Sequence, residues 1–254
     1  RSSDLVGNEV FSHQGLTYGG LVYNEKVKLV SIIGIFKSIL SFLNDNKKEN
    51  LQVKLIPSIY HQKPAEELNY ALFLANAQLI RRDSLAVIDL SLKNSLSKLR
   101  KRSIQKGISN DFVIKEVEDF EPFWNEILIP NLAKKHQAKP VHSLEEINQL
   151  KTSFPENIKQ FNAYYEGEIV AGITLFISKK VVKSQYGATS LKGESVRVLD
   201  FLFIKLINEY SSEYSFFDMG IVDDGDFYNK GLLKQKEELG CSVYLQDVFK
   251  IELL

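Results

Sequence analysis

The chain of 254 residues contains only one cysteine, one methionine, one tryptophan and six prolines. The single cysteine, Cys241, excludes an internal disulfide and fits a reducing compartment. No apolar run reaches the roughly 18 residues of a membrane-spanning helix, and the first residues lack the basic-then-apolar pattern of a secretory signal. We therefore expect a cytoplasmic protein without a transmembrane segment.

An excess of charge of either sign is also missing, because 32 basic residues balance 32 acidic ones. The net field gives no reason to expect non-specific binding to DNA. The basic residues are concentrated only in 93–106, "KNSLSKLRKRSIQK". This stretch predicts a solvated connecting helix over 93–110, with a phosphate-binding face as the alternative.

Two kinds of catalytic site have no support in the residues. The four histidines show no metal-ligand spacing with cysteine or carboxylates, so we expect no metal site. The GxSxG pattern of a serine hydrolase does not occur. The chemistry must then come from other polar side chains.

What is present is a repeated alternation of strand and helix patterns. In the first part we expect a strand over 14–23, a helix over 29–43, a strand over 51–56, a helix over 65–76 and a strand over 84–92. In the second part we expect strands over 112–117, 160–165, 169–177, 181–188, 215–219 and 243–252, and helices over 120–135, from 143 onward, 197–210 and 231–239.

The two parts have the same order of elements after a glycine-rich segment. "SHQGLTYGG" begins at Ser12 and "SQYGATSLKG" begins at Ser184, which places them 172 residues apart (184 minus 12). The second copy has about 70 residues between Phe112 and its glycine-rich strand, whereas the first has 11. We therefore predict an internal duplication whose first copy lacks its opening elements.

Three segments resemble the GNAT-like acyltransferases of Fem type: "NAYYEGEIVAGITLFISKKVVKSQYGATS", "FFDMG" and "NKGLLKQKEELG". The resemblance covers nearly the whole chain, although Leu239-Gly240 stands where the family has Phe-Gly. It implies an α/β (α+β) fold of mixed sheets flanked by helices. The implied domains are an incomplete first GNAT-like copy over 1–92, the basic connecting helix over 93–110 and a complete second copy over 111–254.

The resemblance also implies a function. Fem-type proteins transfer aminoacyl groups to peptidoglycan precursors, so we expect transfer of an acyl or aminoacyl group to a precursor of peptidoglycan or surface polysaccharide. The donor is then aminoacyl-tRNA or acetyl-CoA. Expected partners are a small-molecule or lipid-linked sugar precursor, with tRNA and a second copy of the chain as further candidates. A CoA-dependent sugar N-acetyltransferase and a catalytically degenerate binding domain remain the alternatives.

A candidate cofactor-binding loop precedes the helix expected at 197–210. In GNAT enzymes the corresponding Arg/Gln-x-x-Gly-x-Gly/Ala loop holds pyrophosphate on backbone N–H groups at a helix N-terminus. Here Gly193 matches that pattern, Ser195 is small enough to fit, and Lys192 and Arg197 supply positive charge. Glu194 adds charge of the wrong sign, which argues against a CoA donor.

Candidate catalytic residues cluster after the strand expected at 215–219. Asp218 directly follows two phenylalanines and can accept a proton, while Tyr228 can donate one. Tyr186, at a glycine-flanked strand end, is the third candidate, with a place in the core as its alternative. The remaining aspartates of 223–226 equally fit a solvated acidic loop.

Five further residues are candidates for substrate binding. Lys230 and Lys234 lie one helical turn apart and can face a common anion. Tyr18 sits at the glycine-rich segment of the first copy, where it can line a cleft. Arg81 and Arg82 form a basic pair that would suit a diphosphate, with solvation at the surface as the alternative.

Overall fold

The computed structural model describes residues 5–13, 16–92, 105, 107–224 and 227–253, and divides the chain into two compact units. The first unit comprises 1–84 and 244–254, and the second comprises 85–243. The predicted basic helix over 93–110 falls for the most part outside the described residues. The predicted domain limits at 92 and 111 stay predictions.

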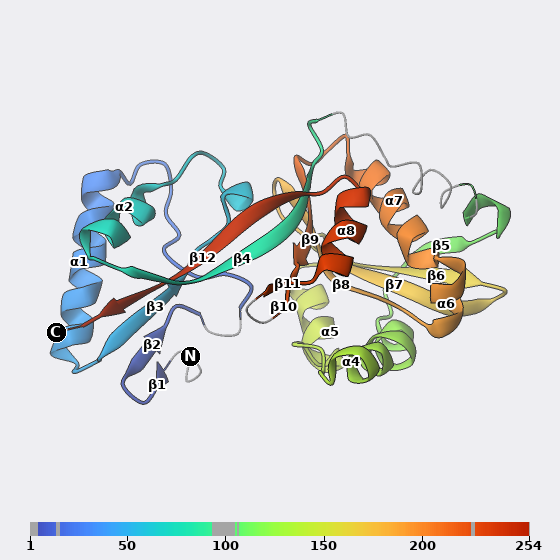
Figure 1. Cartoon of the computed structure of the whole chain (residues 1–254), viewed down its shortest axis with the longest axis horizontal. Coiled ribbons are helices and arrows are strands. Elements are labelled where there is room, and N and C mark those ends of the chain that lie inside the picture. Colours follow the sequence, from blue (N-terminus) through green and yellow to red (C-terminus); the bar gives the residue numbers. More distant parts are fainter. Residues whose placement is uncertain (1–4, 14–15, 93–104, 106, 225–226, 254) are drawn as a thin grey trace. The chain divides into compact units, whose positions relative to one another are not determined.

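The first unit is a mixed sheet covered by two helices (Figure 1). Its core contains Ile32 and Phe36 of the first helix and Leu72 of the second, packed against Val53 and Ile251 of the sheet. The sheet order is β1-β2-β3-β12-β4. The elements are β1 (Leu5–Val6), β2 (Glu9–Phe11), α1 (Leu29–Asp45), β3 (Asn50–Lys54), η2 (Ser58–Tyr60), α2 (Glu67–Leu74), β4 (Gln78–Asp89) and β12 (Ser242–Glu252).

The second unit places helices on both faces of a sheet of order β4-β9-β8-β7-β6-β5 (Figure 1). Leu202 and Leu206 of α7 belong to one core cluster, and Phe123 and Trp124 of η3 belong to the other. The elements are β5 (Val113–Val117), η3 (Phe123–Leu128), α4 (Ile129–His136), α5 (Leu144–Ser153), β6 (Ile158–Tyr165), β7 (Glu168–Ile177), β8 (Val181–Thr189), α6 (Leu191–Val196), α7 (Val198–Tyr210), β9 (Phe216–Ile221), β10 (Asp223–Asp224), β11 (Phe227–Tyr228) and α8 (Lys230–Glu238).

The strand registers confirm the predicted repeat. β2 runs parallel to β3 with Glu9 opposite Asn50, and β8 runs parallel to β9 with Val181 opposite Phe216. Asn50 and Phe216 are equivalent, because each also lies opposite the last residue of a long antiparallel strand. Glu9 therefore corresponds to Val181, a separation of 172 residues (181 minus 9) that equals the separation of the two glycine-rich segments.

The long strands β4 and β12 each belong partly to both units. In the second unit the end of β4 pairs with β9, so that Asp89 lies opposite Phe216. In the first unit the end of β12 pairs with β3, so that Glu252 lies opposite Asn50. Strand β4, the last strand of the first copy, therefore pairs with β9 of the second copy. Strand β12, the last strand of the second copy, pairs with β3 of the first copy.

The glycine pair of the first copy does not lie in the strand expected over 14–23. Strand β2 ends at Phe11 and α1 begins only at Leu29, so Gly19 lies in the segment between these two elements. Instead, the Gly19 N–H donates to the Lys54 carbonyl at 2.9 Å. A Cβ at Gly19 would lie 2.2 Å from the Ser12 carbonyl oxygen, so this close approach of two backbone segments requires glycine.

The described part of the chain has no helix that is both long and apolar enough to cross a bilayer. Helix α1 spans 17 residues, Leu29–Asp45, and contains Lys37 and Asp45, whereas the apolar helix α7 spans only Val198–Tyr210, with Asp200 and Lys205 inside it. Its buried side chains pack against the sheet of the second unit.

Replacing Gly172 with alanine should destabilise the protein by about 1–3 kcal/mol, since overpacking a filled core forces its neighbours to move. Its new Cβ would lie 2.3 Å from the ring of fully buried Phe123. Gly34→Ala is the matched control: Gly34 is exposed in α1 with nothing within 4 Å, and alanine favours a helix. Urea denaturation should show a loss for the first variant and none for the second; equal midpoints would contradict the packing argument.

Candidate active site

The candidate active site lies in the second unit, at the point where strands β8 and β9 separate. Their parallel pairing covers only three positions and ends with Lys183 opposite Asp218. Beyond this point β8 continues along β7 as far as Thr189, and β9 continues along β4 as far as Ile221. The backbone groups on the facing edges are therefore no longer paired with each other, which makes this a place where a ligand can meet the backbone of the sheet.

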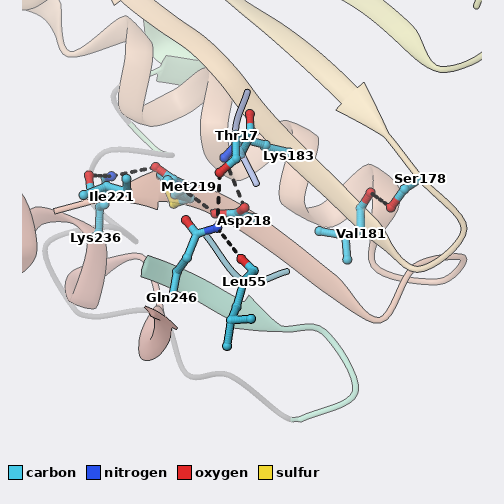
Figure 2. A network of polar contacts seen from close by, with 11 residues as sticks. Thr17, Leu55, Ser178, Val181, Lys183, Asp218, Met219, Ile221, Lys236 and Gln246 are labelled. Atoms are coloured by element: carbon cyan, nitrogen blue, oxygen red, sulfur yellow. Dashed lines mark hydrogen bonds and ion pairs between the residues drawn. The ribbon is translucent and has the colours of Figure 1, made fainter. Parts of the chain in front are cut away.

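Lys236 of α8 reaches this region from the core (Figure 2). Its amine donates hydrogen bonds to the carbonyls of Met219, at 2.6 Å, and Ile221, at 3.4 Å. The residue is only 8% exposed, and burial lowers the pKa of the amine from 10.5 to about 8. An ammonium group has three N–H donors, and within the described residues these two carbonyls account for two of them.

Asp218 forms a buried ion pair with Lys183 across the last paired position (Figure 2). The Lys183 amine donates to Oδ2 of Asp218 at 3.2 Å, and the side chains are 12% and 1% exposed. Oδ1 accepts the Gly220 N–H at 2.7 Å, and Gly220 has a φ of +79°, in the left-handed region that favours glycine. Asp218 therefore fixes the backbone at the end of β9 through Gly220, and it also carries the negative charge that pairs with Lys183.

Cys241 lies buried beside the same cluster. Its Sγ lies 3.4 Å from the Met219 sulfur, and burial raises the pKa of the thiol to about 12. The thiol is consequently neutral at physiological pH. It contributes packing but no negative charge next to Lys236.

The loop that follows β9 places the other catalytic candidate at the surface. Tyr228 lies in β11 opposite Asp223 and is 55% exposed. Residues 225 and 226 fall outside the described part of the chain. Lys230 and Lys234 are both exposed on α8, the helix that carries Lys236, so an anion can reach them. Their assigned roles stay predictions.

Tyr186 lies in the core of the second unit. Its ring makes an edge contact with Trp124, with ring centroids 5.1 Å apart. Its hydroxyl accepts the backbone N–H of His142 at 3.1 Å and lies 2.7 Å from His142 Nδ1. Burial raises the pKa of Tyr186 and lowers the pKa of His142. The structure thus gives Tyr186 a packing role, and its catalytic role stays a prediction.

The candidate cofactor loop is occupied by interactions within the protein. Lys192 pairs with Glu166 at 2.8 Å and Glu168 at 2.9 Å, and these carboxylates raise its pKa. Glu194 pairs with Lys135. A pyrophosphate would have to displace the partners of Lys192.

The remaining residues of this loop are held by close packing and by hydrogen bonds within the protein. A Cβ at Gly193 would lie 2.5 Å from the Val170 carbonyl oxygen, so glycine is required for packing. Ser195 donates its hydroxyl to the Lys192 carbonyl, and exposed Arg197 joins α6 to α7 with a φ of 58°. The structure therefore supplies packing reasons for a glycine that the sequence pattern assigned to phosphate binding.

The three substrate-binding candidates of the first copy lie in the first unit. Exposed Arg81 pairs with Asp83 on its own strand, and exposed Arg82 makes a bidentate pair with Asp247 at 2.7 and 2.8 Å. Each arginine thus already has a carboxylate partner. Tyr18 packs against Tyr60, with ring centroids 4.8 Å apart.

A cavity of about 800 Å³ lies in the first unit beside Tyr60. Residues of 19–28, 55–65 and 67–69 line it. Within it the Tyr23 hydroxyl donates to Glu67 at 2.9 Å, and burial together with Glu67 raises the pKa of Tyr23 to about 12. The lining mixes apolar, amide and charged side chains, which suits a polar ligand of substantial size.

Comparisons with known proteins identify the fold. No family model matches the chain, and no curated protein matches its sequence. The structure is similar to FemX, with a TM-score of 0.69 and 10% identity over 96% of this chain and 80% of that chain. It is similar to L-PGS from Bacillus licheniformis, with a TM-score of 0.65 and 13% identity over 96% and 78% of the two chains.

Two further structures share the fold. The C-terminal domain of a putative lysylphosphatidylglycerol synthetase from Agrobacterium fabrum gives a TM-score of 0.63 and 13% identity, over 88% of this chain and 74% of that one. A tandem GNAT protein from the clavulanic acid biosynthesis pathway gives 0.51 and 9%, over 87% and 69%. At these identities the likeness establishes the fold, which is the tandem GNAT-like fold that the sequence resemblance implied.

Sequence reasoning found Asp218 but missed Lys183 and Lys236. The signal for Lys236 was its position in α8: Leu232, Lys236 and Leu239 recur at helical spacing, so the lysine occupies the apolar face. A lysine on the apolar face of a helix lies against the core, so its amine needs hydrogen-bond acceptors within the protein. Lys183 gave no comparable signal, because its partner is 35 residues away in the sequence.

Proposed function

We propose that this protein transfers an acyl or aminoacyl group to a precursor of the cell envelope. The observation that carries the proposal is the buried Lys236 amine at the point where β8 and β9 part. The shared fold supports it, since FemX and lysylphosphatidylglycerol synthetase have the same architecture. Aminoacyl-tRNA is the donor that we favour, and a peptidoglycan or surface-polysaccharide precursor is the acceptor.

In this reaction an acceptor amine or hydroxyl attacks the ester carbonyl of the donor. A C–N or C–O bond to the acceptor forms, the C–O bond to the ribose breaks, and one proton passes from the acceptor group to the leaving hydroxyl. Negative charge develops on the carbonyl oxygen in between. Protonated Lys236 has two N–H groups directed at Met219 and Ile221, so its third N–H can donate to that oxygen.

Acetyl-CoA suits the structure less well as a donor. Lys192 is held by two glutamates, and Glu194, which pairs with Lys135, adds a carboxylate to the loop that would meet the pyrophosphate. Because like charges in close contact repel, we expect weak binding of acetyl-CoA and stronger binding by Glu194→Gly.

The purified protein should be assayed with two panels of substrates. One pairs labelled aminoacyl-tRNA with nucleotide-linked or lipid-linked muropeptide, or with phosphatidylglycerol. The other pairs acetyl-CoA with nucleotide-linked amino sugars. We expect label transfer only in the first panel. Turnover only in the second would establish the acetyltransferase instead, and stabilisation by a precursor without turnover in either would indicate a binding domain.

A further inference from the structure

The segment that joins α4 to α5, residues 137–143, is anchored to the second unit at His142. Most side chains of the segment are exposed, whereas that of His142 is partly buried. The backbone N–H of His142 donates to Oη of Tyr186 at 3.1 Å, and its carbonyl accepts the Trp124 Nε1–H at 3.3 Å. The ring nitrogen Nδ1 lies 2.7 Å from the same Oη. One hydroxyl of β8 therefore holds both the backbone and the ring of His142.

His142 lies on the face of the sheet that carries the buried ion pair of Lys183 and Asp218. Its ring contacts the ring of Phe176 in β7, with centroids 5.9 Å apart. Phe176 lies directly opposite Lys183 in the antiparallel register of β7 and β8. Residues opposite each other in such a pair project from the same face of the sheet. The segment 137–143 is therefore docked on the same face as the ion pair of the candidate site.

We propose that the contact between His142 and Tyr186 is a pH-sensitive latch, which holds the segment 137–143 on the sheet while the imidazole is neutral and releases it when the imidazole is protonated. In the neutral ring, Nδ1 accepts the Tyr186 O–H over the 2.7 Å contact while Oη accepts the backbone N–H. A protonated ring carries a hydrogen on Nδ1, so two N–H groups of His142 then donate to one oxygen and the phenol hydrogen loses this acceptor. The charged ring is also poorly solvated in its partly buried position.

The surroundings of the ring agree with this direction. Phe176 of β7 and Trp124 of η3 are uncharged, and burial raises the pKa of Tyr186, so its hydroxyl is neutral as well. Glu146 of α5 is the charged group that acts on the ring and it favours the proton, but its carboxylate already accepts a backbone N–H in the capping box. The ion pair on the same face carries no net charge. Burial is the larger effect, and it lowers the pKa of His142 below the ordinary 6.5.

The linkage between this pKa and the latch has a definite sign. An imidazole released from the sheet titrates near 6.5, whereas the docked imidazole titrates lower, so the released form binds the proton more tightly. The latch is therefore fully closed above pH 6.5 and weakens as the pH falls from 6.5 through the lowered pKa. Each unit of difference between the two pKa values increases the opening equilibrium tenfold.

The test measures hydrogen exchange of the His142 amide by NMR between pH 5 and pH 8, with each rate corrected for the intrinsic effect of pH on exchange. We expect the corrected rate to rise as the pH falls, by about tenfold for each unit by which the His142 midpoint lies below 6.5. In His142→Gln, whose side chain does not titrate, the corrected rate should not depend on pH. In Tyr186→Phe the amide should exchange faster at every pH, and the His142 midpoint should move upward towards 6.5.

His61→Gln is the matched control, because it removes a histidine of the first unit. It should keep the pH dependence of the unmodified protein. A corrected rate that is independent of pH in the unmodified protein, or an equal pH dependence in His142→Gln, would overturn the inference. If Tyr186→Phe does not fold, the comparison of His142→Gln with His61→Gln decides the question. These measurements need no substrate, so their outcome is separate from that of the transfer assay.

Discussion

Lys236→Met should lower the rate of aminoacyl transfer by about 100-fold or more. Removing one donor to a developing oxyanion typically costs a factor of about 10² to 10³. Methionine has a length similar to that of lysine but cannot donate to the acyl oxygen or to the carbonyls of Met219 and Ile221. Because these interactions strengthen as charge develops, the loss should fall on kcat and much less on KM.

The measurement is single-turnover transfer of labelled aminoacyl groups, since it isolates the chemical step from product release. Lys179→Met provides a control that removes an exposed lysine in the turn before β8. Circular dichroism should show that both variants fold. A Lys236→Met protein that retains more than about a tenth of the normal rate would remove Lys236 from the mechanism, and the site would have to be sought elsewhere.

The repeat and most of the secondary structure could be predicted from local patterns. A helix is expected from 143 onward, and α5 begins directly after Ser143, which forms a capping box with Glu146. Helix α1 has the expected apolar spacing, with Ile32 and Phe36 buried. The separation of 172 residues between the glycine-rich segments equals that between equivalent strand positions. These features depend on neighbours in sequence or on a register preserved in both copies.

The pairing of the two final strands could not be predicted in the same way. β4 and β12 have the same strand pattern wherever they pair, because alternation along a strand specifies which face is buried and not which neighbour it has. Only the registers show that Asp89 lies opposite Phe216 and Glu252 opposite Asn50. Element order therefore predicted a repeat but not the exchange of strands within it.

The candidate site was only partly predictable for a related reason. Asp218 was identified because it follows two phenylalanines in a strand, which is a local signal. Its partner Lys183 and the position of Lys236 depend on contacts between β8, β9 and α8. Arg82 shows the opposite outcome: a basic residue chosen for phosphate binding already has Asp247 as its partner, 165 residues away.

Lys236→Met should also change how stability depends on pH, and this second prediction does not require a substrate. Burial lowers the pKa of the Lys236 amine to about 8 in the folded protein, whereas an unfolded lysine titrates near 10.5. Below pH 8 both states of the wild type hold the proton, so the full cost of burying a charge is present. Between pH 8 and about 10.5 the unfolded state binds more protons, and wild-type stability rises with pH.

The shift from 10.5 to about 8 is roughly 2.5 units, which at about 1.4 kcal/mol each corresponds to about 3 kcal/mol. The stability of the wild type relative to Lys236→Met should therefore increase by up to that amount between pH 7 and pH 10.5. Cys241 and the tyrosines titrate in both proteins, so their contributions largely cancel in the difference. Urea unfolding of both proteins across this pH range measures the difference in their free energies of unfolding. A difference that does not vary with pH would show that burial does not lower the pKa of Lys236 in the folded protein.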